Sequence, residues 1–252
     1  MSALLEARGL VKSFGPFRAV DGVDLVLESG EMLAMIGPNG AGKSTCFNLI
    51  NGQLAPDAGT VFLTGREITG QPPHRLARQG LARTFQVAAT FGSMSVAENV
   101  EAALCVAAGR GASLWPGGRR RYRAQALDLL ERVGIAAQAE RQCGLLAYGD
   151  LKRVDLALAL AQTPKVLLMD EPTAGMAPGE RAQLMDLVSE IARDGAIAVL
   201  FTEHDMDVVF GHARRIVVLD RGQVLTVGAP DQVRDDPRVR EIYLGPDLEE
   251  SC

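Results

Sequence analysis

The sequence lacks any stretch of about 18 uninterrupted apolar residues, the length that a membrane-spanning helix needs. Its first residues also lack the basic segment that begins a secretory signal peptide. We therefore expect a chain that does not cross a membrane and is not exported by that route. Positive charge is not in excess either. The formal net charge of −5 argues against a protein that binds nucleic acid through bulk charge.

Cysteine is scarce, and the four cysteines have neither the paired spacing of a disulfide framework nor histidines clustered near them. We predict free thiols in a reducing compartment at Cys46, Cys105, Cys143 and Cys252. Cys46 allows two interpretations. A thiolate would be favoured just inside a helix N-terminus, whereas a small side chain packed beneath a loop would be unreactive, and we favour the second.

Internal repeats and low-complexity segments are absent, and a chain of 252 residues suits one large α/β domain or a core with an inserted subdomain. Residues 4–28 alternate between apolar and polar side chains, with Gly and Pro breaks, which predicts antiparallel strands. Apolar runs at residues 166–169 and 196–202 lack this alternation and predict strands of a sheet covered on both faces. Residues 216–228 predict a hairpin.

Strand patterns give way to helical ones between about residues 87 and 154, which predicts a helical insertion. Along the whole chain, the helices expected from periodicity lie at residues 96–104, 124–133, 154–161 and 180–193. The insertion holds the only tryptophan, Trp115, followed by a basic run at residues 119–123. Such a run could contact anionic lipid headgroups or a partner, but we favour the start of a solvated helix.

One short segment carries the clearest chemistry, because it matches the phosphate-binding loop pattern G-x-x-x-x-G-K-[ST] at every fixed position. The loop consists of Gly37, Pro38, Asn39, Gly40, Ala41, Gly42, Lys43, Ser44 and Thr45. An apolar strand precedes it, and a helix is expected at residues 44–50. Glycines let several backbone N–H groups point at one anion, and the helix N-terminus adds partial positive charge. We predict that Lys43 reaches the β- and γ-phosphates and that the Ser44 hydroxyl binds Mg²⁺.

Polar side chains follow the predicted strands. Asp170 and Glu171 follow residues 166–169, where one carboxylate could hold Mg²⁺ and the other could polarise a water for attack on the γ-phosphate. A solvated strand end is the alternative, which the phosphate-binding loop upstream disfavours. His204 follows another buried strand and could contact the γ-phosphate, although alone it would more often be a packed or surface histidine. Gln86 ends a strand expected at residues 81–86 and could bind Mg²⁺ through its carbonyl.

The order of these segments resembles the nucleotide-binding subunit of ABC transporters over essentially the whole chain. The resemblance implies that Glu171 is the catalytic carboxylate, that His204 is the switch histidine, and that Gln86 is a ligand of the nucleotide and its metal. Phe14 matches the aromatic residue that stacks on adenine, with Phe17 as a less favoured candidate. The signature motif, which contacts ATP bound to a partner subunit, corresponds to Leu146, Ala147, Tyr148, Gly149 and Asp150.

The resemblance implies an α/β P-loop NTPase core at about residues 1–86 and 155–252, with an antiparallel β subdomain, and an α-helical subdomain at about residues 87–154. It implies hydrolysis of ATP with Mg²⁺ held by Ser44, Gln86 and Asp170. It also implies a peripheral protein at the cytoplasmic face of the inner or plasma membrane. The expected partners are permease subunits, a second ATPase of the same or a related chain, and a periplasmic binding protein in the full system.

Finer features resemble the ATPases of branched-chain amino acid type importers, including relatives that carry other amino acids, amides or urea. These features are Tyr148 in the signature, the long insertion with a tryptophan, and the C-terminal run at residues 235–245. The lipopolysaccharide-export ATPase is similar at that C-terminal run too. A non-transport ABC ATPase is disfavoured because the chain has a single cassette and no long coiled-coil insertion. A regulatory protein that binds ATP without hydrolysing it is disfavoured by the presence of both Glu171 and His204.

The signature departs from the common form Leu-Ser-Gly-Gly-Gln. Ala147 stands in place of the serine whose hydroxyl contacts the γ-phosphate across the dimer, and Asp150 stands in place of the glutamine. Gly149 and the following helix are retained, and the N-terminus of that helix can still face a phosphate. We therefore expect slow turnover at the site that this signature completes.

Overall fold

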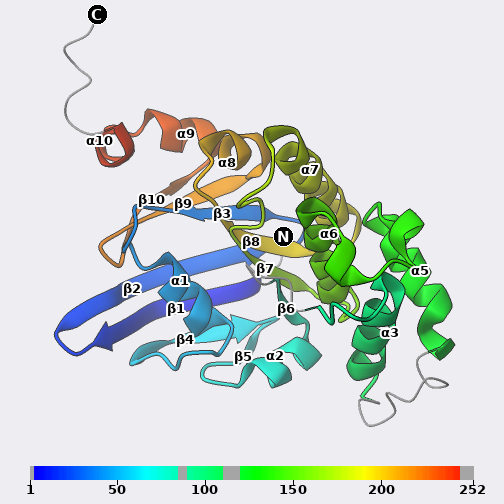
Figure 1. The fold of residues 1–252 in the computed structure, drawn as a ribbon. Helices are drawn as coiled ribbons and strands as arrows, with labels where there is room; N and C mark the ends of the chain where they lie inside the picture. Colours follow the sequence, from blue (N-terminus) through cyan, green and yellow to red (C-terminus); the bar gives the residue numbers. More distant parts are fainter. Residues whose placement is uncertain (1–2, 85–89, 110–119, 245–252) are drawn as a thin grey trace, which may run out of the picture.

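The computed structural model describes residues 3–84, 90–109 and 120–244 and shows two sheets with helices packed around them (Figure 1). The smaller sheet has the strand order β2-β1-β4-β5, formed by β1 (Ala3–Phe14), β2 (Phe17–Glu28), β4 (Ala58–Leu63) and β5 (Arg66–Glu67). All of its pairs are antiparallel, which confirms the antiparallel strands predicted for residues 4–28.

The larger sheet has the strand order β10-β9-β3-β8-β7-β6. Its strands are β3 (Met32–Ile36), β6 (Leu81–Thr84), β7 (Val166–Asp170), β8 (Ala198–Thr202), β9 (Arg215–Asp220) and β10 (Gln223–Gly228). The strands from β9 to β6 run parallel, and β10 pairs antiparallel with β9 as the predicted hairpin. The strand predicted to begin at Ala196 begins two residues later, because Ala196 has a left-handed backbone (φ 50°) that belongs to the preceding turn.

The central strands are buried on both faces, and all five residues of β3 and of β8 are buried. Successive side chains of a strand point to opposite faces, so β3 contributes to two separate cores. Leu33 and Met35 pack with α1 (Lys43–Ile50) and the smaller sheet, whereas Ala34 and Ile36 pack with the helices on the other face. Helix α1 therefore lies between the two sheets, directly after the phosphate-binding loop.

Between β6 and β7 the described residues form helices and no strand, which agrees with the expected helical insertion. The helices of the chain are α2 (Pro73–Gln79), α3 (Val96–Ala107), α5 (Arg123–Arg132), α6 (Tyr148–Leu160), α7 (Pro178–Asp194), α8 (Met206–His212), α9 (Pro230–Asp235) and α10 (Pro237–Leu244). Figure 1 shows α3 and α5 at one side of the molecule, beyond the β6 edge of the larger sheet. The bounds of a helical subdomain at about residues 87–154 stay a prediction.

The helix predicted at residues 154–161 begins earlier than expected, at Tyr148. Its first turn contains Gly149 and Asp150, which have low helix propensity and break the apolar pattern on which the prediction was based. Ala147 is the N-cap residue, and it offers no side-chain oxygen to the first N–H groups of the helix. The residues predicted to form the signature motif therefore lie across the start of α6.

The cysteines in the described part of the chain, Cys46, Cys105 and Cys143, are buried free thiols, whereas Cys252 lies outside the described residues. Cys46 is fully buried, and burial raises its pKa to about 12, which agrees with the packed interpretation and not with the thiolate. The helices that the structure describes include none long and apolar enough to cross a membrane.

The basic run meets the start of a helix, as favoured. Residues 120–122 form a short 3₁₀ turn, and Arg123 begins α5. The Arg123 guanidinium pairs with Glu101, at 3.1 Å between Nη1 and Oε1, and also with Glu140. Trp115 lies outside the described residues.

Candidate nucleotide-binding site

The phosphate-binding loop connects β3 to α1, at the carboxyl edge of the larger sheet. Two of its glycines are required by close packing. A Cβ on Gly37 would collide with the carbonyl oxygen of Leu219, and a Cβ on Gly42 would collide with that of Ala19. Gly42 also has φ 101°, a conformation that side chains disfavour. The loop therefore keeps its backbone pressed between β2 and β9, which holds its N–H groups in one arrangement.

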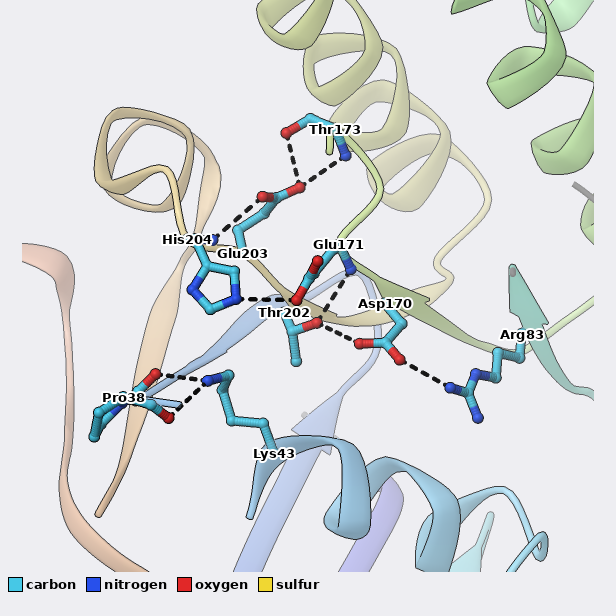
Figure 2. Close-up of polar contacts among 10 residues, drawn as sticks. Pro38, Lys43, Arg83, Asp170, Glu171, Thr173, Thr202, Glu203 and His204 are labelled. Carbon is cyan, nitrogen blue, oxygen red and sulfur yellow. Dashed lines mark hydrogen bonds and ion pairs between the residues drawn. The ribbon is translucent and has the colours of Figure 1, made fainter. Parts of the chain in front are cut away.

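Lys43 is the first residue of α1, and its side chain turns back over the loop. Its Nζ donates to the carbonyl oxygens of Gly37, at 2.6 Å, and of Pro38, at 3.1 Å (Figure 2). Burial lowers the pKa of Lys43, while the nearby charges of Glu171 and Asp170 raise it. The ammonium group is thus held at the loop by weak acceptors that a phosphate can replace.

Asp170 ends β7, and both of its oxygens have partners. The Thr202 hydroxyl donates to Oδ1 at 2.7 Å, and Arg83 Nη2 donates to Oδ2 at 2.9 Å. The donors lie on the neighbouring strands β8 and β6, so the carboxylate is oriented from both sides of its own strand (Figure 2). Sequence reasoning had placed Asp170 at a strand end but had missed both donors.

Glu171 and His204 meet beside the loop although 33 residues separate them. His204 Nε2 lies 2.9 Å from Glu171 Oε1, and Figure 2 shows the pair above Lys43. The side chain of His204 is 52% exposed, which leaves the imidazole free to turn toward a ligand. Each residue was predicted to follow a buried strand, and the structure adds that these strands, β7 and β8, are neighbours.

A cavity of about 280 Å³ opens in front of the loop. It is lined by the loop from Asn39 to Thr45, by Phe14, Phe17 and Ala19, and by Glu171 and His204. Phe14 and Phe17 are both largely exposed, at 48% and 59%. The structure thus gathers the aromatic candidates, the phosphate-binding loop and the carboxylate–histidine pair around one space. Gln86 lies outside the described residues.

Comparison with known proteins identifies the family. Residues 20–174 match the ABC transporter family. The chain belongs to that family. Residues 223–245 also match the branched-chain amino acid ATP-binding cassette transporter family, as the resemblance at the C-terminal run implied.

The relatives of this ABC ATPase match nearly its whole length. It is 40% identical to BraF of Pseudomonas aeruginosa, a high-affinity branched-chain amino acid transport ATP-binding protein, over 96% of this chain and 98% of the relative. It is 38% identical to the lipopolysaccharide export ATP-binding protein LptB of Acidithiobacillus ferridurans, over 97% of this chain and 98% of the relative. A solved ATP-binding cassette of an ABC transporter in its ADP conformation covers 97% of this chain and 100% of its own, with 33% identity and a TM-score of 0.85. The predicted α/β fold and the ATPase activity are confirmed.

The residues predicted to form the signature, 146–150, lie elsewhere, and none of them lines the cavity at the phosphate-binding loop although the structure describes all of them. The Tyr148 ring lies beside Gly175, and the Lys152 Nζ is 5.4 Å from the ring centroid. The Glu180 carboxylate lies against Gly149. This separation is compatible with the prediction that these residues contact ATP bound to another subunit.

Further polar residues near the site were missed from the sequence. The clearest is Glu203, which is 4% exposed and accepts hydrogen bonds from the backbone N–H and the hydroxyl of Thr173, both at 2.8 Å. Burial raises the pKa of Glu203, and the Thr173 donors oppose the rise. The one sequence signal for Glu203 was its place between a buried strand and His204.

Proposed function

We propose that this ABC ATPase binds ATP in the cavity at the phosphate-binding loop and hydrolyses it to drive transport through membrane permease subunits. One observation carries the proposal. The Glu171–His204 pair, with 2.9 Å between Oε1 and Nε2, lines the same cavity as Lys43 and the loop. A carboxylate that can act as a base, an exposed imidazole and a cation around one phosphate-binding loop are groups that can support phosphoryl transfer to water.

Binding would begin at the loop. Its N–H groups would donate to the β- and γ-phosphates, and the Lys43 ammonium would leave the carbonyl oxygens of Gly37 and Pro38 for the charged phosphate. The adenine would stack on an exposed aromatic ring at the cavity rim, for which Phe14 is preferred. In this proposal the loop binds the phosphates, and an aromatic ring at the cavity rim binds the adenine.

Mg²⁺ fits the oxygen donors that the site offers. Ser44, which carries a hydroxyl, lines the cavity, and the Asp170 carboxylate is held in place by Thr202 and Arg83. Mg²⁺ prefers few protein ligands together with water and substrate phosphates, so one hydroxyl and one carboxylate suffice. Gln86 is proposed as a further ligand. When bound, the ion would neutralise charge on the phosphate oxygens during transfer.

Hydrolysis would use the carboxylate–histidine pair. Glu171 would accept a proton from the water that attacks the γ-phosphorus, and the bond to the β-phosphate oxygen would break to leave ADP and phosphate. His204 would turn from Glu171 toward the γ-phosphate and orient the water. Its exposed imidazole can make that turn without disturbing the core.

The transport context follows from the relatives. BraF is named for the transport of branched-chain amino acids, and the C-terminal match belongs to a family with the same description. We propose import of branched-chain or related amino acids or amides, with this ATPase at the cytoplasmic face of the membrane. Its partners would be permease subunits, a second ATPase of the same or a related chain, and a periplasmic binding protein.

Glu171→Gln tests the chemistry. We expect the variant to bind MgATP but to release phosphate at least ~100-fold more slowly, the scale of a lost general base. ATP should also keep it dimeric longer in size-exclusion chromatography, because hydrolysis no longer separates the subunits. Glu190→Gln, an exposed carboxylate on α7, is the matched control and should behave as wild type. Unimpaired phosphate release by Glu171→Gln would move the role to another residue.

The substrate class needs a cellular measurement. A strain without this ATPase should lose uptake of radiolabelled leucine, isoleucine or valine. The wild-type chain should restore the uptake, and Glu171→Gln should not. Normal amino acid uptake together with loss of surface lipopolysaccharide would instead favour the export function of the relative LptB.

A further inference from the structure

The backbone of Glu171 is strained. Its φ of 47° lies in the left-handed region, which residues with a side chain avoid, and Pro172 follows it directly. Such a conformation persists only where neighbouring contacts hold it. Two of these contacts are made by the N–H of Glu171, which donates to the carbonyl and the hydroxyl oxygens of Thr202, both at 3.1 Å.

A buried contact holds the same segment two residues further on. Thr173 donates to Glu203 Oε1 from both its N–H and its hydroxyl, each at 2.8 Å, and the His204 N–H donates to Oε2 at 3.3 Å (Figure 2). Thr173 is 1% exposed and Glu203 is 4% exposed. Burying a carboxylate costs free energy unless hydrogen-bond donors satisfy it. The three donors therefore favour a single arrangement around the Glu203 carboxylate.

Together with the chain itself, these contacts form a closed ring that includes the proposed catalytic pair, Glu171 and His204. The chain runs from Glu171 to Thr173, crosses to Glu203, continues to His204, and returns to Glu171 through the 2.9 Å contact with the imidazole. The ring begins where β7 and β8 end, since Asp170 and Thr202 are the last registered pair of those parallel strands. Beyond that pair the sheet no longer sets the distance between the two segments, and Glu203 takes over.

We propose that Glu203 is a positioning residue, whose carboxylate holds Thr173 and the N–H of His204 and thereby sets the placement of Glu171 against His204. The proposal rests on the catalytic roles proposed above for Glu171 and His204. Glu203 does not line the cavity, so it acts through these two residues and not on the nucleotide. ATP binding, which uses the loop, should be independent of it.

Thr173 offers a sharp test, because Thr173→Val removes the hydroxyl donor while keeping the shape and Thr173→Ser retains the donor. In single-turnover assays with the full chain in excess over ATP, we expect Thr173→Val and Glu203→Gln to slow hydrolysis by about 10- to 100-fold, the scale of a small misplacement of reacting groups. The ATP affinity should stay within about twofold of the wild type on the same reasoning. Thr173→Ser should stay near the wild-type rate.

Folding can be controlled independently. Arg181 joins the same region through Asp205, at 2.5 Å, and through the Met176 carbonyl, at 2.8 Å, so the variants should keep their fold. Thr69→Val is the matched control, because its hydroxyl accepts from the Val61 N–H in the smaller sheet, away from the cavity. It should lose some thermal stability without any change in rate.

Two results would overturn the proposal. One is a folded Thr173→Val or Glu203→Gln that hydrolyses ATP at the wild-type rate. The other is a double variant whose loss equals the product of the single losses, since residues of one ring should not act independently. If the wild type hydrolyses ATP no faster than Lys43→Ala, the proposed ATPase function is refuted. That result would leave the positioning role of Glu203 to be decided separately. Hydrogen exchange then decides, because exchange at Glu171 and Thr173 should speed up in Glu203→Gln, and unchanged exchange would refute the ring.

Discussion

Arg83 and Asp170 form an ion pair between the neighbouring strands β6 and β7, with 2.9 Å between Nη2 and Oδ2. The other terminal nitrogen, Nη1, donates to Asn48 on α1 at 2.8 Å and to Gln53 at 2.9 Å. One guanidinium therefore connects the helix after the phosphate-binding loop to the carboxylate proposed to hold Mg²⁺. Its Nε is buried and has no partner among the described residues. The two terminal nitrogens, Nη1 and Nη2, therefore make all the hydrogen bonds that hold the guanidinium in place within the described part of the chain.

Arg83→Met should raise the Mg²⁺ concentration needed for half-maximal ATPase activity by about fivefold, the equivalent of one lost hydrogen bond of roughly 1 kcal/mol. The reason is that Asp170 keeps only the Thr202 contact and loses its orientation. Mg²⁺ titration of nucleotide binding gives a readout that does not depend on turnover. A lower Mg²⁺ requirement would show instead that Arg83 competes with the metal.

Lys43→Ala should lose most ATP affinity or nearly all turnover while staying folded. The backbone amides of the loop cannot neutralise the phosphate charge alone, and the ammonium is the cation that the loop holds in place. Equilibrium binding of a fluorescent ATP analogue and phosphate release measure the two effects. Lys165→Ala removes an exposed lysine at the opposite end of β7 and should match the wild type. Equal MgATP binding by a folded Lys43→Ala would remove the phosphate-binding assignment.

Phe14→Ala should weaken ATP binding about tenfold or more, because stacking of a base on an aromatic ring contributes roughly 1–3 kcal/mol. Phe17→Ala is the natural comparison, since both rings line the cavity and both are exposed. Its effect should be smaller. Measured affinities in the reverse order would assign the stacking to Phe17.

Replacing the signature residues Ala147→Ser and Asp150→Gln together should raise the ATPase activity of the purified chain. Ala147 offers no hydroxyl at the start of α6, and Asp150 adds negative charge to its first turn, beside the Glu180 carboxylate at Gly149. A hydrogen bond to a charged group contributes about 1.5–3 kcal/mol, enough to slow one composite site substantially.

A related partner ATPase would supply a competent signature to this chain's own phosphate-binding loop, so the wild type alone should hydrolyse slowly. Adding the purified partner should accelerate ATP hydrolysis by the wild-type chain. The double variant should show a smaller difference between its activity alone and its activity with the partner. The proposal of a heterodimer with a related ATPase fails on two results together: the double variant gains no ATPase activity, and the wild type alone is as fast as the assembled transporter.

The sequence alone determined the parts of this protein whose chemistry is contiguous. The phosphate-binding loop could be recognised because its glycines, Lys43 and Ser44 must follow one another to surround a phosphate. Asp170, Glu171 and His204 could be placed at strand ends because buried apolar runs precede them. The α/β fold followed from the same patterns, whereas the first turn of α6 was missed because its residues lack apolar periodicity.

Only the tertiary structure decided which distant residues touch. Arg83 reaches Asp170 across 87 residues, and Thr173 reaches Glu203 across 30, because β6, β7 and β8 lie side by side in one parallel register. Strands that are apolar on both faces carry no alternation that would set their register, so packing against the helices on the two faces of the sheet decides it. The burial that makes Glu203 depend on its donors, and Cys46 unreactive, arises only once the sheets and α1 close around them.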